Sequence, residues 1–257
     1  MSSHNVKSVS VVLAVATLAG CSTSVTLQNP TIPDPLIDKL PLAVGVRYPE
    51  RFEHYVHEEK VIGKDEWTID LGRSNSMLFT KLFGSMFTDC TIIGPRGDPE
   101  KMPTTCNFVP PDTDPHDLQI DALIEPTIDA LEFSVPKQSQ TDAFAVWIRY
   151  RIKIFDHEGN EIANWPISAY GKSATTFMGS DEALSRAAVL AMRDAAALVI
   201  LQMDKATGIS ALSANRRALR QDSAAGGAEA DTGGTKAVPV NEPLQSTATE
   251  ETDNESG

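Results

Sequence analysis

Two histidines and three glutamates lie within one short stretch near the start of the chain. His54 and His57 are interleaved with Glu53, Glu58 and Glu59. If this stretch is helical, the two histidines lie on one face, because residues three positions apart are neighbours on a helix. Imidazole and carboxylate groups are zinc ligands, yet this spacing matches no established zinc motif. We therefore expect a solvated charged surface here, with a metal site as the alternative.

The chain contains none of the common catalytic signatures. The G-x-S-x-G nucleophile elbow, the H-E-x-x-H zinc motif, the phosphate-binding glycine loop and the dinucleotide fingerprint are all absent from the sequence. Glu125 and Asp129 form an acid pair of the kind that glycoside hydrolysis requires. Such pairs arise by chance in a chain with 35 acidic residues. We therefore expect a protein that is not an enzyme, with no catalytic residue, no cofactor and no metal.

A row of basic side chains interrupts a sequence whose formal net charge is −13. Arg149, Arg151 and Lys153 alternate with apolar residues, and Trp147 continues the same row. Because successive side chains of a strand point to opposite faces, the four share one face. On the outside of a sheet they would gather positive charge and contact an acidic protein or an anionic glycolipid. The alternative is a solvated strand face that neighbouring acids neutralise.

The strand that carries this row belongs to a predicted hairpin. Residues 146–154 and 162–170 both alternate between apolar and polar side chains, and the turn-forming residues 156–160 lie between them. This pattern predicts a long antiparallel hairpin. Residues 40–48 alternate in the same way and predict a further strand, with Pro41 near its start because proline cannot donate to a ladder.

Three more elements complete the predicted domain. Residues 118–133 alternate around Pro126, which indicates a strand that is bent or bulged at the proline. Ser74 or Ser76 can cap a helix with a wide stripe of Phe, Leu and Met, which we expect to face the core. Ser180 can cap a second, alanine-rich helix.

The order strand, helix, strand, hairpin, helix predicts an α+β fold. We expect a mostly antiparallel sheet with two helices packed on one face, in a single domain that covers residues 40–209. A segment of this length is long enough to bury a proper core.

Both ends of the chain lack the apolar content of a core. Residues 21–39 contain three prolines and predict an extended spacer. Residues 210–257 are predicted to be an acidic disordered tail, because they offer too little apolar surface to offset the entropy cost of ordering. From residue 221 onward the tail has one lysine against eight acids. This acidity argues against nucleic acid as a partner, since phosphate binding depends on a positive field.

The first twenty residues have the pattern of an export signal. Lys7 precedes an apolar run over residues 9–19, which is too short to span a membrane. The run ends at Leu18-Ala19-Gly20-Cys21, which resembles the lipobox of bacterial lipoproteins. The resemblance implies that residues 1–20 are cleaved as a signal peptide and that acyl chains on Cys21 anchor the protein in a membrane. The alternative is an ordinary secretory signal with a coincidental cysteine.

The residue after the cysteine indicates which membrane carries the anchor. Ser22 occupies the position where Gram-negative lipoproteins retained at the inner membrane have aspartate. The resemblance to that sorting rule implies attachment to the outer membrane on its periplasmic face.

Cys90 and Cys106 are the only cysteines left if Cys21 carries lipid. They bracket the first half of a stretch rich in Gly and Pro, and the periplasm is oxidising. We expect a disulfide that stabilises the fold by about 3 kcal/mol in the chain-entropy model. The alternative is two buried free thiols, and a metal site would need more ligands than these two supply.

Lipobox, spacer and small α+β domain together resemble the periplasmic lipoproteins that support lipopolysaccharide assembly, transport complexes or secretion. The resemblance implies a non-catalytic accessory or scaffold subunit of an envelope complex, whose partners are the membrane and an envelope protein. Trp147, Arg149, Arg151 and Lys153 would then carry the protein contact.

The alternative function is a lipid-anchored periplasmic hydrolase that acts on cell-wall material. It would need acids or histidines that converge in a concave pocket. Its nearest candidates are Glu53, His54, His57 and Asp70. The sequence leaves the oligomeric state open.

Overall fold

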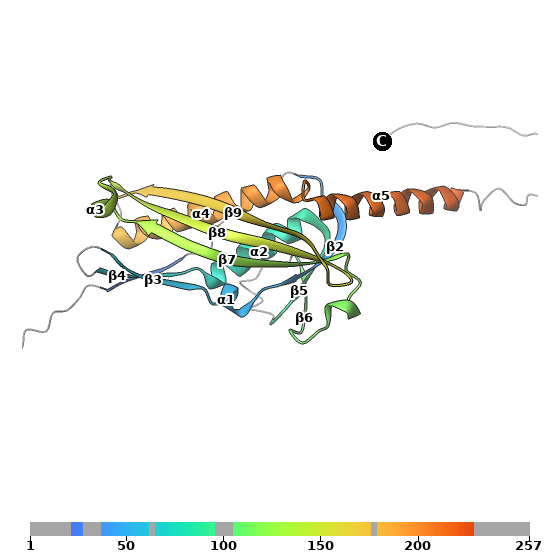
Figure 1. Ribbon diagram of the computed structural model, residues 1–257, viewed down its shortest axis with the longest axis horizontal. Helices are drawn as coiled ribbons and strands as arrows, with labels where there is room; N and C mark the ends of the chain where they lie inside the picture. The colour runs from blue at the N-terminus through green and yellow to red at the C-terminus, as the bar shows by residue number, and fades with distance from the viewer. Residues whose placement is uncertain (1–21, 28–36, 62–64, 96–104, 176–178, 229–257) are drawn as a thin grey trace, which may run out of the picture. The chain divides into compact units, whose positions relative to one another are not determined.

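The computed structural model describes residues 22–27, 37–61, 65–95, 105–175 and 179–228, which form two sheets and five α-helices (Figure 1). The helices are α1 (Glu50–Glu53), α2 (Gly72–Met86), α3 (Pro136–Ser139), α4 (Ser180–Met203) and α5 (Thr207–Ala228), with a 3-10 helix η1 (Pro115–Asp117). Residues 1–218 make one compact unit, and residues 219–257 make a second. The predicted signal peptide and Cys21 lie outside the described residues. No helix in the described ranges is both long and apolar enough to cross a membrane.

The larger sheet has six strands in the order β6-β5-β2-β7-β8-β9. These are β2 (Leu40–Arg47), β5 (Phe87–Ile93), β6 (Asn107–Val109), β7 (Ala122–Ser134), β8 (Ala143–Asp156) and β9 (Glu161–Ala174). β2 pairs in parallel with both β5 and β7, and β5 pairs in parallel with β6. The pairs β7–β8 and β8–β9 are antiparallel. The fold is α+β as predicted, but the sheet is mixed, so the prediction of a mostly antiparallel sheet is wrong.

The parallel half of the sheet depends on the crossover that contains α2. Parallel neighbours need such a connection, whereas a tight turn can join antiparallel ones. The sequence hid β5, because its first residue, Phe87, directly follows the last residue of α2 and continues the apolar stripe of that helix. Sequence periodicity therefore predicts these residues as part of the helix and of the loop after it, and β5 is a correction from the structure.

The predicted antiparallel hairpin is confirmed as β8 and β9, which pair along almost their full length of 14 residues each. Gly159 in the turn has a φ of 82°, a left-handed conformation that glycine adopts without steric cost. The Asp156 carboxylate accepts hydrogen bonds from the backbone N–H and the side-chain amide of Asn160, at 2.8 and 3.0 Å. The turn thus combines backbone freedom with a side-chain cap, as its composition indicated.

Both predicted long helices are present, and α4 begins at Ser180, but neither helix has a predicted serine as its N-cap. α2 has Leu71 as its N-cap, and Ser74 and Ser76 are buried inside the helix. α4 has Gly179 as its N-cap, and neither N-cap residue makes a side-chain capping hydrogen bond. The apolar stripe predicts that a helix exists, whereas its first residue depends on the tertiary surroundings.

α4 packs against β8 and β9 at short range. Gly171 of β9 permits this approach, because a Cβ there would overlap the carbonyl oxygen of Ala187 and the backbone nitrogen of Ala191. Both alanines are fully buried. The helix therefore lies close to the sheet because small residues meet on both sides of the contact.

The core between α1, α2 and β8 is aromatic. The rings of Phe52, Phe79 and Tyr150 contact one another with centroids 5.3 to 6.4 Å apart. The Tyr150 hydroxyl donates a hydrogen bond to the side-chain oxygen of Asn75 at 2.8 Å. Because Tyr150 and Asn75 are fully buried, this bond ties α2 to the sheet.

The smaller sheet has the order β1-β4-β3, formed by β1 (Ser22–Thr26), β3 (Val56–Val61) and β4 (Asp65–Asp70). β1 pairs in parallel with β4, and β4 pairs antiparallel with β3. The prediction of an extended spacer is therefore wrong for residues 22–27. Val25 and Leu27, which are 3 % and 7 % exposed, give this stretch the apolar surface that holds it in the fold. Residues 28–36 lie outside the described residues.

α5 occupies the first part of the predicted disordered tail. Ile209 is fully buried, and Arg216 binds the Asp121 carboxylate at 2.6 Å. The prediction of disorder from residue 210 onward is therefore wrong for residues 210–228, which are helical. Residues 229–257 lie outside the described residues.

The predicted disulfide between Cys90 and Cys106 is confirmed. Cys90 lies on β5 and Cys106 directly precedes β6, and the residues that follow them, Thr91 and Asn107, are register partners. The bond therefore joins the short edge strand β6 to the rest of the sheet. It closes a loop whose middle, residues 96–104, lies outside the described residues.

Candidate functional site

The outer face of β7, β8 and β9 carries the basic row that the sequence indicated. Trp147 and Arg149 are exposed on this face, whereas the alternating residues Ile148 and Tyr150 are buried in the core. α2 and α4 pack on the opposite, inner face, so the three strands lie in front of these helices in Figure 1. The row therefore shares one exposed face, as its alternation predicted.

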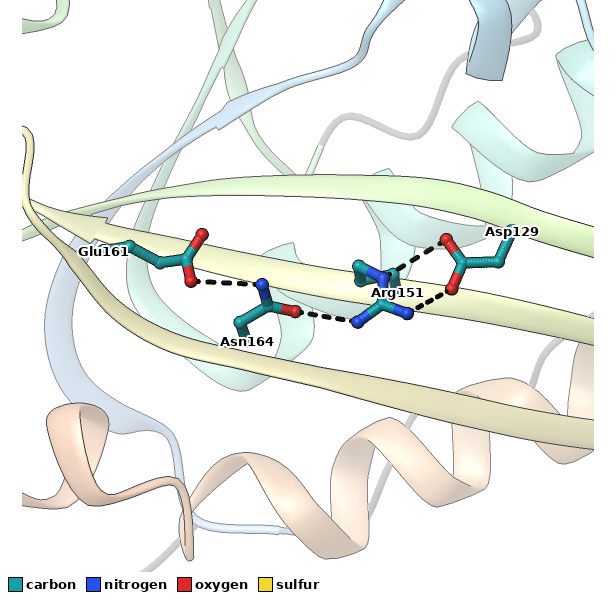
Figure 2. A network of polar contacts seen from close by, with 4 residues as sticks. All are labelled: Asp129, Arg151, Glu161 and Asn164. Carbon is teal, nitrogen blue, oxygen red and sulfur yellow. Dashed lines mark hydrogen bonds and ion pairs between the residues drawn. The ribbon is translucent and has the colours of Figure 1, made fainter.

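Arg151 is held in a polar network on this face (Figure 2). Its Nε and Nη2 atoms donate to the two carboxylate oxygens of Asp129, at 3.2 and 2.6 Å. Its Nη1 atom donates to the side-chain oxygen of Asn164 at 3.1 Å, and the Asn164 amide donates to Glu161 at 3.1 Å. Hydrogen bonding to Asp129 raises the pKa of the Arg151 guanidinium. Its donor groups are thus directed to partners within the fold.

Each of the two acids considered for glycoside hydrolysis binds a different arginine. Asp129 binds Arg151, as described, and Glu125 binds Arg47 with its Oε1 atom 2.6 Å from the Arg47 Nε atom. Lys153 lies between Glu125 and Asn164 in the strand register. Within the described ranges no carboxylate lies in ion-pair distance of Lys153. This half of the outer face is therefore a surface of mostly paired charges.

The other half of the face contains a hollow of about 290 Å³. Trp147 and Tyr170 are 44 % and 43 % exposed, and their ring centroids lie 5.2 Å apart. Arg149 and Glu132 also line the hollow, and the small residue Ser168 lies opposite Arg149 in the register. Among the described residues neither Arg149 nor Glu132 has an ion-pair partner. We call these five residues the aromatic hollow.

A β-bulge in β7 separates the aromatic hollow from the polar network. Thr127 pairs with Arg151 and Ala130 pairs with Arg149, so Asp129 is the extra residue on β7. The bulge lets Asp129 reach Arg151 and places the small Ala130 beside Arg149, which leaves space for the hollow. The predicted irregularity in this strand is thus present, but at Asp129 rather than at Pro126.

Three residues of the aromatic hollow were missed from the sequence. One is Ser168, the register partner of Arg149. The other two, Tyr170 and Glu132, are register partners of Trp147, one on each neighbouring strand. Tyr170 could have been found by extending the alternation of the hairpin to its second strand. Glu132 could not, because the bulge changes which β7 residues face outward.

The histidines near the start of the chain lie in different elements. His54 is the C-cap of α1, with its Nδ1 atom 3.2 Å from the carbonyl oxygen of Glu50. His57 lies on β3, with its Nε2 atom 3.2 Å from the Glu59 carboxylate and its ring against Phe133. The helix that would place both histidines on one face is therefore replaced by a short helix followed by a strand. Within the described ranges no group of three or more His, Cys, Asp or Glu is arranged to hold a metal ion.

The two other hydrolase candidates, Glu53 and Asp70, lie at the ends of different elements. Asp70 ends β4, and its Oδ1 atom accepts a hydrogen bond from the backbone N–H of Gly72 at 3.2 Å. Glu53 ends α1, and burial raises the pKa of its carboxyl more than the neighbouring charge of His54 lowers it. Asp70 therefore binds the first backbone N–H of α2.

Comparison with known proteins identifies no family. No family model matches the chain, and no curated protein matches it. A candidate lipoprotein of Caulobacter crescentus CB15 is 9 % identical, covers 37 % of this chain and 70 % of its own length, and has a TM-score of 0.27. The hypothetical protein CT253 of Chlamydia trachomatis is 10 % identical. The match covers 64 % of this chain and 96 % of CT253, with a TM-score of 0.34. Lipoprotein GNA1162 of Neisseria meningitidis is 13 % identical. The match covers 39 % of this chain and 76 % of GNA1162, with a TM-score of 0.21. All three TM-scores are too low to establish a shared fold.

Proposed function

We propose that this chain is a lipoprotein of the bacterial envelope that acts as a non-catalytic accessory subunit of a transport or assembly complex. Acyl chains on Cys21 anchor it to the periplasmic face of the outer membrane, and the aromatic hollow binds an envelope protein. The lipobox sequence supports the anchor. The exposed pair of Trp147 and Tyr170 beside an unpaired Arg149 is the observation that carries the contact.

The composition of the hollow favours a protein as its occupant. Trp, Tyr and Arg are the residues most enriched among those that dominate binding energy at protein interfaces. They lie beside a rim of paired polar groups, as the central residues of such interfaces do. A hollow of about 290 Å³ is at the small end of the range for ligand clefts, so it suits a side chain of a partner better than a whole ligand.

The charges define the surface that the partner presents. Arg149 has no ion pair within the described part of the chain, so it is available to a carboxylate on the partner. An apolar side chain next to that carboxylate would enter the hollow between Trp147 and Tyr170. Arg151 contributes less than the sequence suggested, because Asp129 and Asn164 already occupy its donors.

The test is crosslinking in living cells, with a photoreactive amino acid in place of Ser168 at the hollow. We expect a reproducible crosslink to one envelope protein. Trp147→Ala or Arg149→Glu should weaken that crosslink strongly, since truncating a residue of this kind costs about 2 kcal/mol of binding energy, which is roughly 30-fold in affinity.

Arg51→Glu serves as the matched control. Arg51 is exposed on α1 and does not line the hollow, so this substitution changes the net charge as Arg149→Glu does without touching the hollow. The crosslink should persist in this variant. If the partner stays bound when Trp147 and Arg149 are both replaced, the aromatic hollow is not the contact.

A further inference from the structure

The strand β1 begins at Ser22, directly after the proposed anchor. One residue spans at most about 3.6 Å, so acyl chains on Cys21 would lie within a few ångströms of a folded sheet. Ser22 is the register partner of Glu66, near the start of β4. The anchor therefore fixes one end of the smaller sheet at the membrane surface, with no spacer in between.

Ring contacts show that the smaller sheet and the β7–β8 hairpin run toward the same end of the compact unit. Phe52, shortly before β3, contacts Tyr150 in the middle of β8. Toward the first residue of β8, Phe144 contacts Trp67 of β4, with ring centroids 5.6 Å apart. Trp67 is the register partner of Thr23, so Phe144 lies level with the start of β1. Figure 1 accordingly shows the strands β3 and β4 extending toward the same end as α3.

The link between β7 and β8 is suited to a layer of lipid headgroups. It contains α3, and residues 137–142 are all exposed. Residues 135–142 carry one lysine, Lys137, and one acid, Asp142, and the other polar side chains are neutral. A lysine near anionic headgroups is favourable, and neutral polar groups can hydrogen-bond to them.

The opposite end of the hairpin is acidic. The turn between β8 and β9 and its flanks carry Asp156, Glu158 and Glu161. Strands of 14 residues separate this turn from α3 by roughly 45 Å. Anionic lipid would repel these three acids, and it would also repel Glu59 and Glu66 at the end that carries the anchor. The position of Cys21 and the ring contacts therefore decide which end faces the membrane.

The geometry points to a domain that stands end-on on the membrane, with α3, the start of β1 and the Val61 end of β3 nearest the headgroups and the β8–β9 turn farthest away. This inference rests on the proposed acylation of Cys21. It also locates the aromatic hollow, because Trp147 is three residues along β8 from Phe144, a rise of about 10 Å. The hollow then faces sideways close to the bilayer, and its partner is a protein held in the same membrane.

Single-cysteine labelling of the acylated, full-length chain tests the orientation. With Cys21 acylated and Cys90 bonded to Cys106, an introduced cysteine is the only free thiol. Gln138→Cys, Ser168→Cys and His157→Cys place a fluorescent donor at the proposed membrane end, at the hollow and at the far turn, all at exposed residues. The protein is reconstituted in vesicles of phosphatidylethanolamine and phosphatidylglycerol that contain a headgroup-labelled acceptor lipid.

We expect energy transfer to decrease in the order Gln138, Ser168, His157, with several-fold more quenching at the first than at the last. Equal transfer from all three sites, or the reverse order, would overturn the end-on orientation. Mass spectrometry of the same preparation measures acylation of Cys21, and sedimentation of vesicles with the Cys21→Ala variant measures anchoring. If the Cys21→Ala variant still binds vesicles, or if no acyl chain is found, the anchor itself is wrong and the inference fails with it. If anchoring depends on Cys21 and the transfer order is reversed, the orientation fails alone.

Discussion

At the scale of single residues, the hydrogen bond between Tyr150 and Asn75 links the sheet to the helix layer. Burial raises the pKa of the Tyr150 hydroxyl, so the group stays protonated and remains a donor in the physiological range. The Asn75 oxygen accepts from it, and the Asn75 amide nitrogen has no partner within the described ranges. The Tyr150 hydroxyl is therefore the contact that offsets the cost of burying this amide.

Tyr150→Phe should lower the free energy of unfolding by about 1–3 kcal/mol, because it leaves the buried oxygen of Asn75 without a donor. Urea denaturation followed by circular dichroism measures the change. Tyr170→Phe removes the same atom from an exposed ring and should alter stability by less than about 0.5 kcal/mol. Equal effects of the two substitutions would contradict the structural role of the buried bond.

The Asp156 carboxyl should titrate below its ordinary range, because hydrogen bonds from Asn160 lower its pKa. A depressed carboxyl pKa stabilises the folded hairpin above the pKa of the unfolded chain. That contribution is lost as the pH falls through the lower, folded value. Carboxyl NMR should show the low pKa, and Asn160→Ala should move it back toward about 3.9. Asn164→Ala is the control, and an unchanged Asp156 pKa in Asn160→Ala would refute the assignment.

At the scale of elements, β9 is an edge strand that other chains could extend. Two features protect it. Asp194 of α4 accepts a hydrogen bond from the backbone N–H of Tyr170 at 2.9 Å, and Pro166 has no N–H to offer. Unpaired backbone groups on a long edge invite association, and both devices reduce their number. The close packing of α4 against β9 therefore protects the strand as well as the core.

Gly171→Ala should destabilise the fold by at least about 2 kcal/mol, since the added Cβ overlaps the α4 backbone at Ala187 and Ala191. Gly94→Ala is the matched control, because a Cβ there would meet only one side-chain atom of Ile92, at 4.0 Å. Thermal unfolding of both variants gives the comparison. A stability of Gly171→Ala like that of Gly94→Ala would show that α4 moves away from the sheet without cost.

At the scale of the whole molecule, the acidic segment beyond α5 and the folded unit are expected to be energetically separate. Residues 229–257 contain seven acids and one lysine, and their composition provides little apolar surface for packing. Ending the chain at Ala228 should therefore leave the Tm within about 1 °C of the full-length value.

Ending the chain before α5 is the contrasting truncation. It removes the buried Ile209 and Ser213 and the ion pair of Arg216 with Asp121. We expect the Tm to fall by at least about 5 °C, in line with the loss of buried apolar surface. If ending the chain at Ala228 lowers the Tm as much, then the acidic segment packs against the fold.

The sequence by itself determined the elements whose signal is local. Alternation along β8 and the turn at Gly159 predict the hairpin, and the alanine-rich stripe predicts α4, because both patterns depend on neighbours a few residues away. The expectation of an oxidising compartment, together with the two cysteines that remain beside Cys21, was enough to predict the disulfide. The shared exposed face of Trp147 and Arg149 follows from the same alternation.

Only the tertiary structure decided the features that depend on distant segments. The parallel pairing of β2 with β5 needs a crossover, and β1 is a strand only because β4 lies beside it. The bulge at Asp129 divides the outer face into a network closed around Arg151 and a hollow around Arg149. A bulge and a pairing partner are set by the packing of segments far apart in the chain, so local periodicity cannot predict them.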